Sequence, residues 1–229
     1  TSTFHTFNNR AYFVASDGTS TGQVWGTDGT AANTTLLSDI VPEAPFSTIL
    51  LADAINLPSR FIFPVSDGTS RSELWRSDGT ADGTYLIESF SPPTPGQSPF
   101  ICIAYSFVNN SIVQNLFQGD KFFVMAGNTA FGDEMWVSDG TEEGTNVLKD
   151  INPGPASGVD LSTNFSYVYT NSDFFFSGSD GVHGNELWRT NGTTAGTTMV
   201  QDIYLNAGNS EPELTFVNNS KVIFSATDG

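Results

Sequence analysis

The chain has 229 residues, of which 25 are acidic and 8 are basic, and its formal net charge is −17. This charge argues against nucleic acid and anionic membrane surfaces as partners, because both would repel the chain. The single cysteine, Cys102, excludes a disulfide within one copy and is predicted to be a buried, unreactive thiol, and no apolar run is long enough to predict a membrane span.

A tryptophan followed by a turn recurs four times. In each copy Asp or Asn stands three residues after the tryptophan, Gly four after and Thr five after. The tryptophans are Trp25, Trp75, Trp136 and Trp188, so successive copies are 50, 61 and 52 residues apart. That spacing predicts a repeated unit of the length of a four-stranded propeller blade. Short apolar runs and abundant Gly, Pro, Ser, Thr and Asn favour an almost wholly β chain.

Taken in chain order, the sequence divides into four units and the beginning of a fifth. Each is predicted to hold an apolar strand, a turn, the tryptophan strand, a second turn and a further strand. The apolar runs are continuous, as in residues 174–176, which indicates strands buried on both faces. The predicted bounds are 1–43, 44–95, 96–155, 156–207 and, for the incomplete fifth unit, 208–229.

The third and fifth units depart from this pattern. The third has extra residues between Phe100 and Lys121, which we interpret as a loop insertion without a role in binding. The fifth repeats the opening of the first unit, so we expect the sequence to be part of a longer array. The predicted fold is a single all-β array: a β-propeller or propeller segment of four-stranded antiparallel blades.

The turns are predicted from their glycines. Asp-Gly and Asn-Gly supply the positive φ of tight hairpin turns, so we expect a left-handed backbone four residues after each tryptophan. The positions are Gly29, Gly79, Gly140 and Gly192. A second left-handed point is predicted four residues further on, at Asn33, Gly83, Gly144 and Gly196. The tryptophans themselves are expected to pack between blades in preference to forming a sugar-stacking surface.

These units resemble the ELWxxDGT repeat of large extracellular, chiefly bacterial, hyalin-like proteins. The resemblance is carried by Glu73-Leu74-Trp75 with Asp78-Gly79-Thr80 and by the three other copies, and it covers essentially the whole chain. It implies a β-propeller or similar β-repeat fold and a secreted or cell-surface location, and it implies no settled activity. The departures are Gln23-Val24 for Glu-Leu, Asn128 and Asn191 for Asp, and Ser89 where the other units have Asp.

Calcium is a possible ligand, because aspartates recur at loop positions and carboxylate oxygens suit a hard cation. The candidates in the turns before the tryptophans are Asp17, Asp67 and Asp180. Asn replaces Asp at two turn positions, and no Asp-x-Asp-x-Asp-Gly loop occurs. Turn formation is therefore the favoured role for most of these aspartates, with calcium as an addition, and no other cofactor is expected.

Two functions remain open. The first is a non-catalytic extracellular structural or adhesive module, because repeated surfaces let the same contact be made many times. Its partners would be other copies of the chain or surface and matrix components.

The alternative is a carbohydrate-binding or sialidase-like glycosidase propeller, because Asp-Gly turns beside Trp resemble the Asp-box hairpins of sialidases. Such enzymes need an arginine cluster, whereas the arginines here stand at repeated positions where a structural role is expected. They are Arg10, Arg60, Arg71, Arg76 and Arg189. His5 and His183 are isolated and are predicted to be surface or turn residues.

Five Asn-x-Ser/Thr sequons are candidate glycosylation sites in a secretory host, about the number expected by chance in such a chain. Their asparagines are Asn33, Asn109, Asn164, Asn191 and Asn218.

Overall fold

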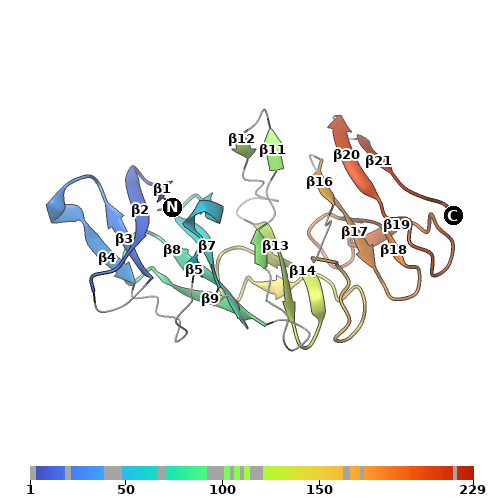
Figure 1. Ribbon diagram of the computed structural model, residues 1–229, viewed down its shortest axis with the longest axis horizontal. Helices are drawn as coiled ribbons and strands as arrows, with labels where there is room; N and C mark the ends of the chain where they lie inside the picture. The colour runs from blue at the N-terminus through green and yellow to red at the C-terminus, as the bar shows by residue number, and fades with distance from the viewer. Residues whose placement is uncertain are drawn as a thin grey trace.

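The structure, a computed structural model, describes residues 4–18, 22–38, 48–66, 71–91, 101–103, 106–108, 111–113, 121–161, 166–170, 173–218 and 221–229. These residues form antiparallel β-sheets that follow one another across the molecule in chain order (Figure 1). Within those ranges the chain forms no α-helix, and no helical segment has the length and apolar character to cross a bilayer. The predicted all-β fold of antiparallel sheets is confirmed; among the described residues three sheets have four strands and one, in unit 2, has five. Blade number and ring closure stay predictions.

Unit 1 is a sheet in the order β1-β2-β3-β4. Its strands are β1 (Phe4–Phe7), β2 (Arg10–Ala15), β3 (Gln23–Thr27) and β4 (Thr35–Ser38). Asn8 and Asn9 turn the chain between β1 and β2 with φ of 49° and 59°, a conformation that asparagine tolerates better than most residues. A short 3-10 turn, η1 (Ala31–Asn33), lies between β3 and β4.

Units 2 to 4 repeat this arrangement. Unit 2 contains β5 (Thr48–Ile49), β7 (Arg60–Ser66), β8 (Ser72–Ser77) and β9 (Tyr85–Phe90); β6 (Ile55–Leu57), which follows the 3-10 turn η2 (Leu51–Asp53), also pairs with β7. Unit 3 contains β10 (Ile101–Ile103), β13 (Phe122–Asn128), β14 (Gly132–Ser138) and β15 (Asn146–Val147). Unit 4 contains β16 (Tyr167–Tyr169), β17 (Phe174–Ser179), β18 (Asn185–Thr190) and β19 (Thr198–Gln201).

Two hairpins lie outside these sheets. β20 (Glu213–Asn218) and β21 (Lys221–Ser225) form a two-stranded sheet, called half-unit 5 below. β11 (Ser106–Val108) pairs with β12 (Ser111–Val113) within the predicted insertion, and Figure 1 shows this hairpin standing beyond the end of β13. The side chain of Cys102, on β10, lies outside the described residues.

The pairing register is the same in all four units. Each tryptophan lies opposite an apolar residue of the preceding strand, because the two strands alternate in step. The pairs are Trp25 with Phe13, Trp75 with Phe63, Trp136 with Val124, and Trp188 with Phe176. The spacing that recurs in the sequence is therefore the spacing of one sheet geometry.

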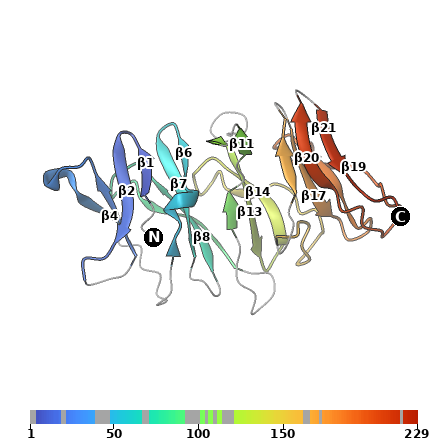
Figure 2. The ribbon, with the colours of Figure 1, turned by 45° about the horizontal axis from the view of Figure 1, so that its top comes forward.

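In the part of the chain that the structure describes, buried hydrophobic side chains form three clusters, and each lies between two adjacent units. The first joins units 1 and 2, and Trp75 packs against it. The second joins units 2 and 3 and contains Trp136, and the third joins units 3 and 4 and contains Trp188. Trp136 and Trp188 are buried at 6% and 5% exposure. Figure 2 shows the sheets standing side by side, as this sharing of cores requires.

Candidate functional site

The turn after each tryptophan has the same internal hydrogen bonds in every unit. In unit 2, Thr80 donates from its N and Oγ1 to Asp78 Oδ1 at 2.9 and 2.6 Å. Ser77 Oγ and Thr84 Oγ1 lie 2.7 Å apart, which joins the two ends of the loop. Units 1, 3 and 4 repeat both contacts. The aspartate is thus fixed by its own loop, as a turn residue is.

The first glycine register has the predicted backbone. φ is 95°, 92°, 79° and 80° at Gly29, Gly79, Gly140 and Gly192. The loop is longer than the two-residue hairpin turn that the Asp-Gly pairs indicated, because residues 28–34 separate β3 from β4 and residues 78–84 separate β8 from β9.

The prediction of a left-handed backbone at the second glycine register is wrong. Gly83, Gly144 and Gly196 are not among the residues with positive φ, and neither is Asn33. A Cβ at Gly83 would overlap the Asp78 carboxylate, and the glycines of units 3 and 4 meet the equivalent side chains in the same way. In unit 1, Asn33 Nδ2 donates to Asp28 Oδ2 at 2.6 Å instead. At this position the side chain at the start of the turn therefore comes very close to the backbone. Glycine leaves room for that side chain, and Asn33 instead forms a hydrogen bond with it.

The turn of unit 3 docks on the sheet of unit 2. Arg60, at the start of β7, donates from an Nη to Asp139 O at 2.7 Å, and Arg76 of β8 donates to Gly140 O at 3.3 Å. A Cβ on Gly140 would lie 2.9 Å from both the Arg60 Nε and an Ile62 methyl group. Gly140 is buried, so the missing side chain also makes room for the neighbouring sheet.

The other interfaces use the same surfaces. The Tyr12 hydroxyl of unit 1 lies where a Cβ of Gly79 would be, at 2.6 Å. Between units 3 and 4, Lys149 Nζ donates to Thr197 O at 2.7 Å, and its ammonium lies 5.6 Å from the Trp188 ring centroid. Sequence reasoning missed these contacts, although the recurrence of a cation at positions 10, 60 and 121 was a visible signal.

The glutamate two residues before the tryptophan fixes the chain where it crosses to the next unit. Glu134 Oε1 accepts from the backbone N of Ile151 and Asn152 at 3.3 and 3.4 Å. Glu186 accepts from the backbone N of Ile203 at 3.0 Å, and Ser210 Oγ donates to it at 2.7 Å. Both glutamates have an exposure of 0%.

Glu134 is the more poorly satisfied of the two. Gly158 occupies the place that Ser210 takes in unit 4, and a Cβ there would collide with the Glu134 carboxylate. Within the described residues, Glu134 Oε2 has no hydrogen-bond partner, and neither has Asp150 Oδ1. Burial therefore raises the pKa of Glu134 from 4.5 to about 8, and the charge of nearby Asp150 adds to the shift.

In unit 2 the equivalent glutamate has different partners. Glu73 accepts from Trp75 Nε1 at 2.8 Å and forms an ion pair with Arg71 at 3.0 Å. Ser89 replaces the crossover aspartate in this unit, so the unit lacks the second acid.

The candidate metal ligands are not brought together. Asp180 accepts from the backbone N of Val182 and His183 and lies 2.7 Å from His183 Nδ1. Asp17 is exposed on unit 1, and Asp67 lies outside the described residues. Across the part of the chain that the structure describes, no group of three His, Cys, Asp or Glu side chains has metal-binding geometry.

The histidines lie at an interface and in a turn. His5 Nε2 lies 2.8 Å from Asn56 Oδ1, and the centroid of its ring lies 5.1 Å from that of Phe61. His5 is therefore half-buried between units 1 and 2, and the prediction of a surface or turn position is wrong for this residue. His183 is in the turn before β18, as predicted, and its hydrogen bond with Asp180 raises its pKa above 6.5.

The arginines predicted as structural do not converge on one pocket. Arg60 and Arg76 contact the turn of unit 3, Arg71 pairs within unit 2, and Arg10 donates to Asn33 O at 2.8 Å. Arg189 is exposed on β18.

The sequons are dispersed over the units. Asn33 is exposed and bonded to its own turn, and Asn191 is half-buried in the equivalent turn. Asn109, Asn164 and the side chain of Asn218 lie outside the described residues.

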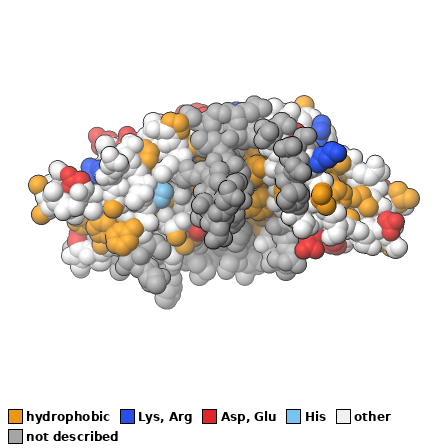
Figure 3. All heavy atoms as spheres, turned by 90° about the horizontal axis from the view of Figure 1, so that it is seen from above, with side chains coloured by type: hydrophobic (Ala, Val, Ile, Leu, Met, Phe, Trp, Pro, Cys, Tyr) orange, Lys and Arg blue, Asp and Glu red, His pale blue; other side chains and the backbone are white. Residues whose placement is uncertain are grey.

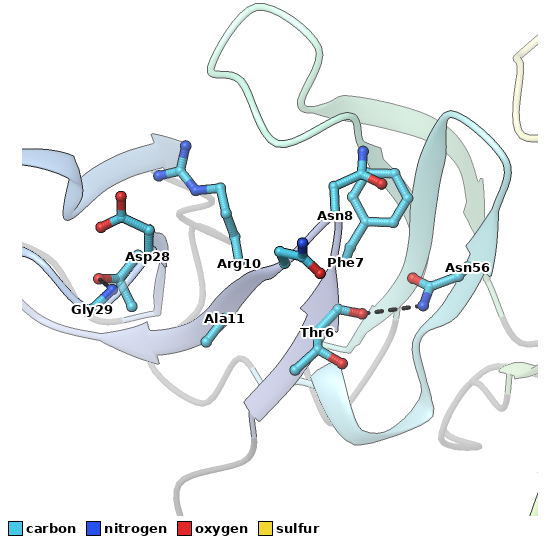
Figure 4. Close-up of a pocket in the computed structure, with 10 residues that line it drawn as sticks. Thr6, Phe7, Asn8, Arg10, Ala11, Asp28, Gly29 and Asn56 are labelled. Atoms are coloured by element: carbon cyan, nitrogen blue, oxygen red, sulfur yellow. Dashed lines mark hydrogen bonds between the residues drawn. The ribbon is translucent and has the colours of Figure 1, made fainter.

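A pocket of about 740 Å³ opens where unit 1 meets unit 2 (Figure 4). Polar side chains surround it: Asn8, Asn9, Arg10, Asp28 and Asn56. Asn56 Nδ2 donates to the Thr6 carbonyl at 3.1 Å across one side, and Arg10 and Asp28 lie on the other (Figure 4). Hydrogen bonds from Thr30 and Asn33 lower the pKa of Asp28 to about 2. Sequence reasoning did not find this pocket, because it combines two hairpins from different units.

Comparisons with known proteins do not assign a family. No family model matches the chain, and no curated protein matches it. The resemblance to the ELWxxDGT repeat therefore stays a prediction.

Solved structures give weak likenesses. The chain is similar to oligopeptidase B from Trypanosoma brucei, with 10% identity and a TM-score of 0.45, over 88% of this chain and 27% of that one. It is also similar to an exo-β-1,3-galactanase from Phanerochaete chrysosporium, with 9% identity and a TM-score of 0.37, over 93% of this chain and 52% of that one. A third similar structure is an α-L-arabinofuranosidase from Clostridium thermocellum, with 12% identity and a TM-score of 0.33, over 86% of this chain and 70% of that one. The chain thus spans about a quarter of the length of the oligopeptidase and about half of the length of the galactanase.

Proposed function

We propose that this chain is a non-catalytic structural module whose repeated units build a surface or matrix assembly outside the cell. One observation carries the proposal: the recurring polar side chains of the unit bond to the protein's own backbone and loops. The turn aspartates accept from their own threonines, and Glu134 and Glu186 accept from crossover backbone. Residues bonded in this way stabilise the sheets and their connections, so the recurring sequence serves the packing of one unit against the next. The extracellular location rests on the resemblance to ELWxxDGT repeats.

A hydrolysis assay tests this proposal. We expect the chain to release no more product than buffer from aryl galactosides, aryl arabinofuranosides and peptide anilides. We expect Glu186→Gln to lower the midpoint of unfolding, because glutamine has one acceptor oxygen where Glu186 uses two. Hydrolysis that disappears in Glu186→Gln, with the fold retained, would contradict the proposal.

Carbohydrate binding is a second candidate, and the pocket in Figure 4 favours it. Amide and guanidinium groups around a cavity of about 740 Å³ can hydrogen-bond sugar hydroxyls. The two glycosidases named above fit this candidate better than they fit the scaffold, but likenesses at such TM-scores carry no substrate over to this chain.

A glycan array with a matched variant tests the second candidate. The double variant Asn8→Gly, Asn9→Gly removes two amides from the pocket, and glycine tolerates the φ of 49° and 59° found there. Binding by the natural sequence that is lost in the variant supports a glycan site. An array on which the natural sequence binds nothing removes the candidate.

A further inference from the structure

The turn after the tryptophan begins with an aspartate in three units and with an asparagine in the fourth. The aspartates are Asp28, Asp78 and Asp139, and Asn191 takes their place in unit 4. Half-unit 5 ends before the residues that would form this turn, so the comparison covers units 1 to 4. Asn191 is followed by Gly192, and this is the one Asn-Gly pair in the sequence. Unit 4 therefore has an amide, next to a glycine, where the other units have a carboxylate.

The loop of unit 4 binds the side chain of Asn191 as the other loops bind their aspartates, but less closely. Asn191 Oδ1 accepts from Thr193 N at 3.2 Å and from Thr193 Oγ1 at 2.7 Å. In the three aspartate turns the bond from the backbone N is 2.9 Å long. A carboxylate is a stronger acceptor than an amide and forms shorter hydrogen bonds. The two donors of Thr193 would therefore stabilise an aspartate at position 191 more than they stabilise the asparagine.

The amide nitrogen of Asn191 adds no hydrogen bond to the turn. Among the described residues, Asn191 Nδ2 donates to no acceptor, and it lies close to the backbone of Gly196, where a Cβ would be 2.5 Å from it. In unit 1 the second oxygen of the aspartate, Asp28 Oδ2, accepts from Asn33 Nδ2. Loss of the Asn191 Nδ2 would therefore break no hydrogen bond within the described part of the protein.

Gly192 places a backbone nitrogen beside that amide with little steric hindrance. Gly192 is half-buried, has a φ of 80° and donates from its N to Thr190 Oγ1 at 3.0 Å. Because glycine has no Cβ, no side chain of this residue obstructs a succinimide ring between its N and Asn191 Cγ. Residues 193–195, which follow in the loop, are exposed, so water has access to the turn.

We propose that Asn191 is a modification site that deamidates to aspartate in the folded protein, which gives the turn of unit 4 the carboxylate of the other three. The Gly192 N attacks Asn191 Cγ, the Cγ–Nδ2 bond breaks, and ammonia leaves with the proton that the Gly192 N gives up. Water then adds to Cγ and breaks its bond to the Gly192 N, which restores the main chain. Water is the sole co-reactant. The inference goes beyond the scaffold function and does not rest on it.

The loop favours aspartate over isoaspartate as the product. Addition of water to the main-chain carbonyl of the ring would route the main chain through Cβ and Cγ and lengthen it by one atom. The loop is closed by Thr190 Oγ1 and Thr197 Oγ1, which lie 2.7 Å apart, and Thr197 Oγ1 also donates to Thr193 O at 2.8 Å. A longer main chain would disturb both contacts, whereas aspartate leaves the path of the loop unchanged.

The new carboxylate also interacts with the other charges of the chain. The net charge is −17, and acidic side chains are scattered over the described part of the face shown in Figure 3. Their repulsion opposes part of the gain from stronger hydrogen bonds, but it is screened at 0.15 M salt, where the Debye length is about 8 Å. At that ionic strength we expect Asn191→Asp, which mimics the product, to have a higher urea midpoint than the natural sequence.

Mass spectrometry of the 229-residue chain tests the proposal. The chain is produced in a bacterial cytoplasm, because a glycan on Asn191 Nδ2 would block the loss of ammonia. It is then incubated in a warm, mildly alkaline buffer. We expect the peptide that contains residues 190–197 to gain the mass of an acid in place of an amide, and fragmentation by electron transfer to identify aspartate as the main product. The same incubation in urea should give mainly isoaspartate, because the loop is then unfolded.

Two controls separate the effect of this turn from general deamidation. Asn33 lies in the equivalent turn of unit 1, is followed by Thr34 and is bonded through its Nδ2, so it should keep its amide. Asp78→Asn places an Asn-Gly pair in the turn of unit 2 and should deamidate as Asn191 does. An Asn191 that keeps its amide in the folded chain and loses it in urea overturns the proposal. A folded product that is mainly isoaspartate, or a lower urea midpoint for Asn191→Asp, overturns it as well.

Discussion

The buried glutamate of unit 3 gives the sharpest prediction. Burial raises the pKa of Glu134 to about 8, so the folded protein holds a proton there that the unfolded protein releases above about pH 4.5. Its contribution to stability is therefore fully present below about pH 4.5 and is lost as the pH rises toward 8. A difference of about 3.5 in pKa corresponds to about 5 kcal/mol between these limits.

Glu134→Gln removes this titration. The glutamine oxygen can still accept from the backbone N of Ile151 and Asn152, and the side chain keeps its volume. We expect the free energy of unfolding of the variant, relative to the natural sequence, to increase between pH 5 and pH 9, by up to about 5 kcal/mol.

Urea denaturation followed by tryptophan fluorescence at pH 5, 7 and 9 measures the difference. Glu142→Gln, at an exposed position in the turn of the same unit, is the matched control and should follow the natural sequence. Parallel pH profiles of Glu134→Gln and the natural sequence would refute the reasoning, because they would show that the carboxyl group is not held protonated.

Three further predictions concern the turns. Gly144→Ala should lower the free energy of unfolding by about 2 kcal/mol in urea denaturation, because its methyl group would overlap the Asp139 carboxylate; an unchanged midpoint would contradict that overlap. Asp180→Asn should lower the pKa of His183 toward 6.5 in an NMR titration. The natural pair should stabilise the fold below about pH 6.5 and lose that effect as the pH passes the raised pKa of His183. A chelator should leave the midpoint of thermal unfolding unchanged, because the turn carboxylates are bonded to their own loops; a lower midpoint would indicate a bound calcium ion.

Much of the unit could be predicted from its sequence, because it repeats. The register of Trp75 against Phe63 and the positive φ of Gly79 follow from local residue types, and they recur four times. A local sequence pattern does not show whether a side chain at the start of a turn lies against the backbone at its end. For that reason the glycine at position 83 was interpreted by its backbone freedom, although its role is to leave space for Asp78.

The contacts between units were beyond the sequence for another reason. Arg60 bonds to a carbonyl group 79 residues away, and no spacing within one unit reports that partner. The pocket beside Asn56 has the same origin, since the hairpins that form it belong to two sheets. The glutamate of units 2 to 4 was visible as a recurring residue, but the bonds of Glu134 and Glu186 to the crossover backbone depend on the path between sheets.

Because each hydrophobic cluster is shared by just two neighbouring sheets, the cohesion of this molecule is a nearest-neighbour property. Gene duplication can then lengthen such a chain without redesign: a copied unit brings a donor surface and an acceptor surface that already match those on either side.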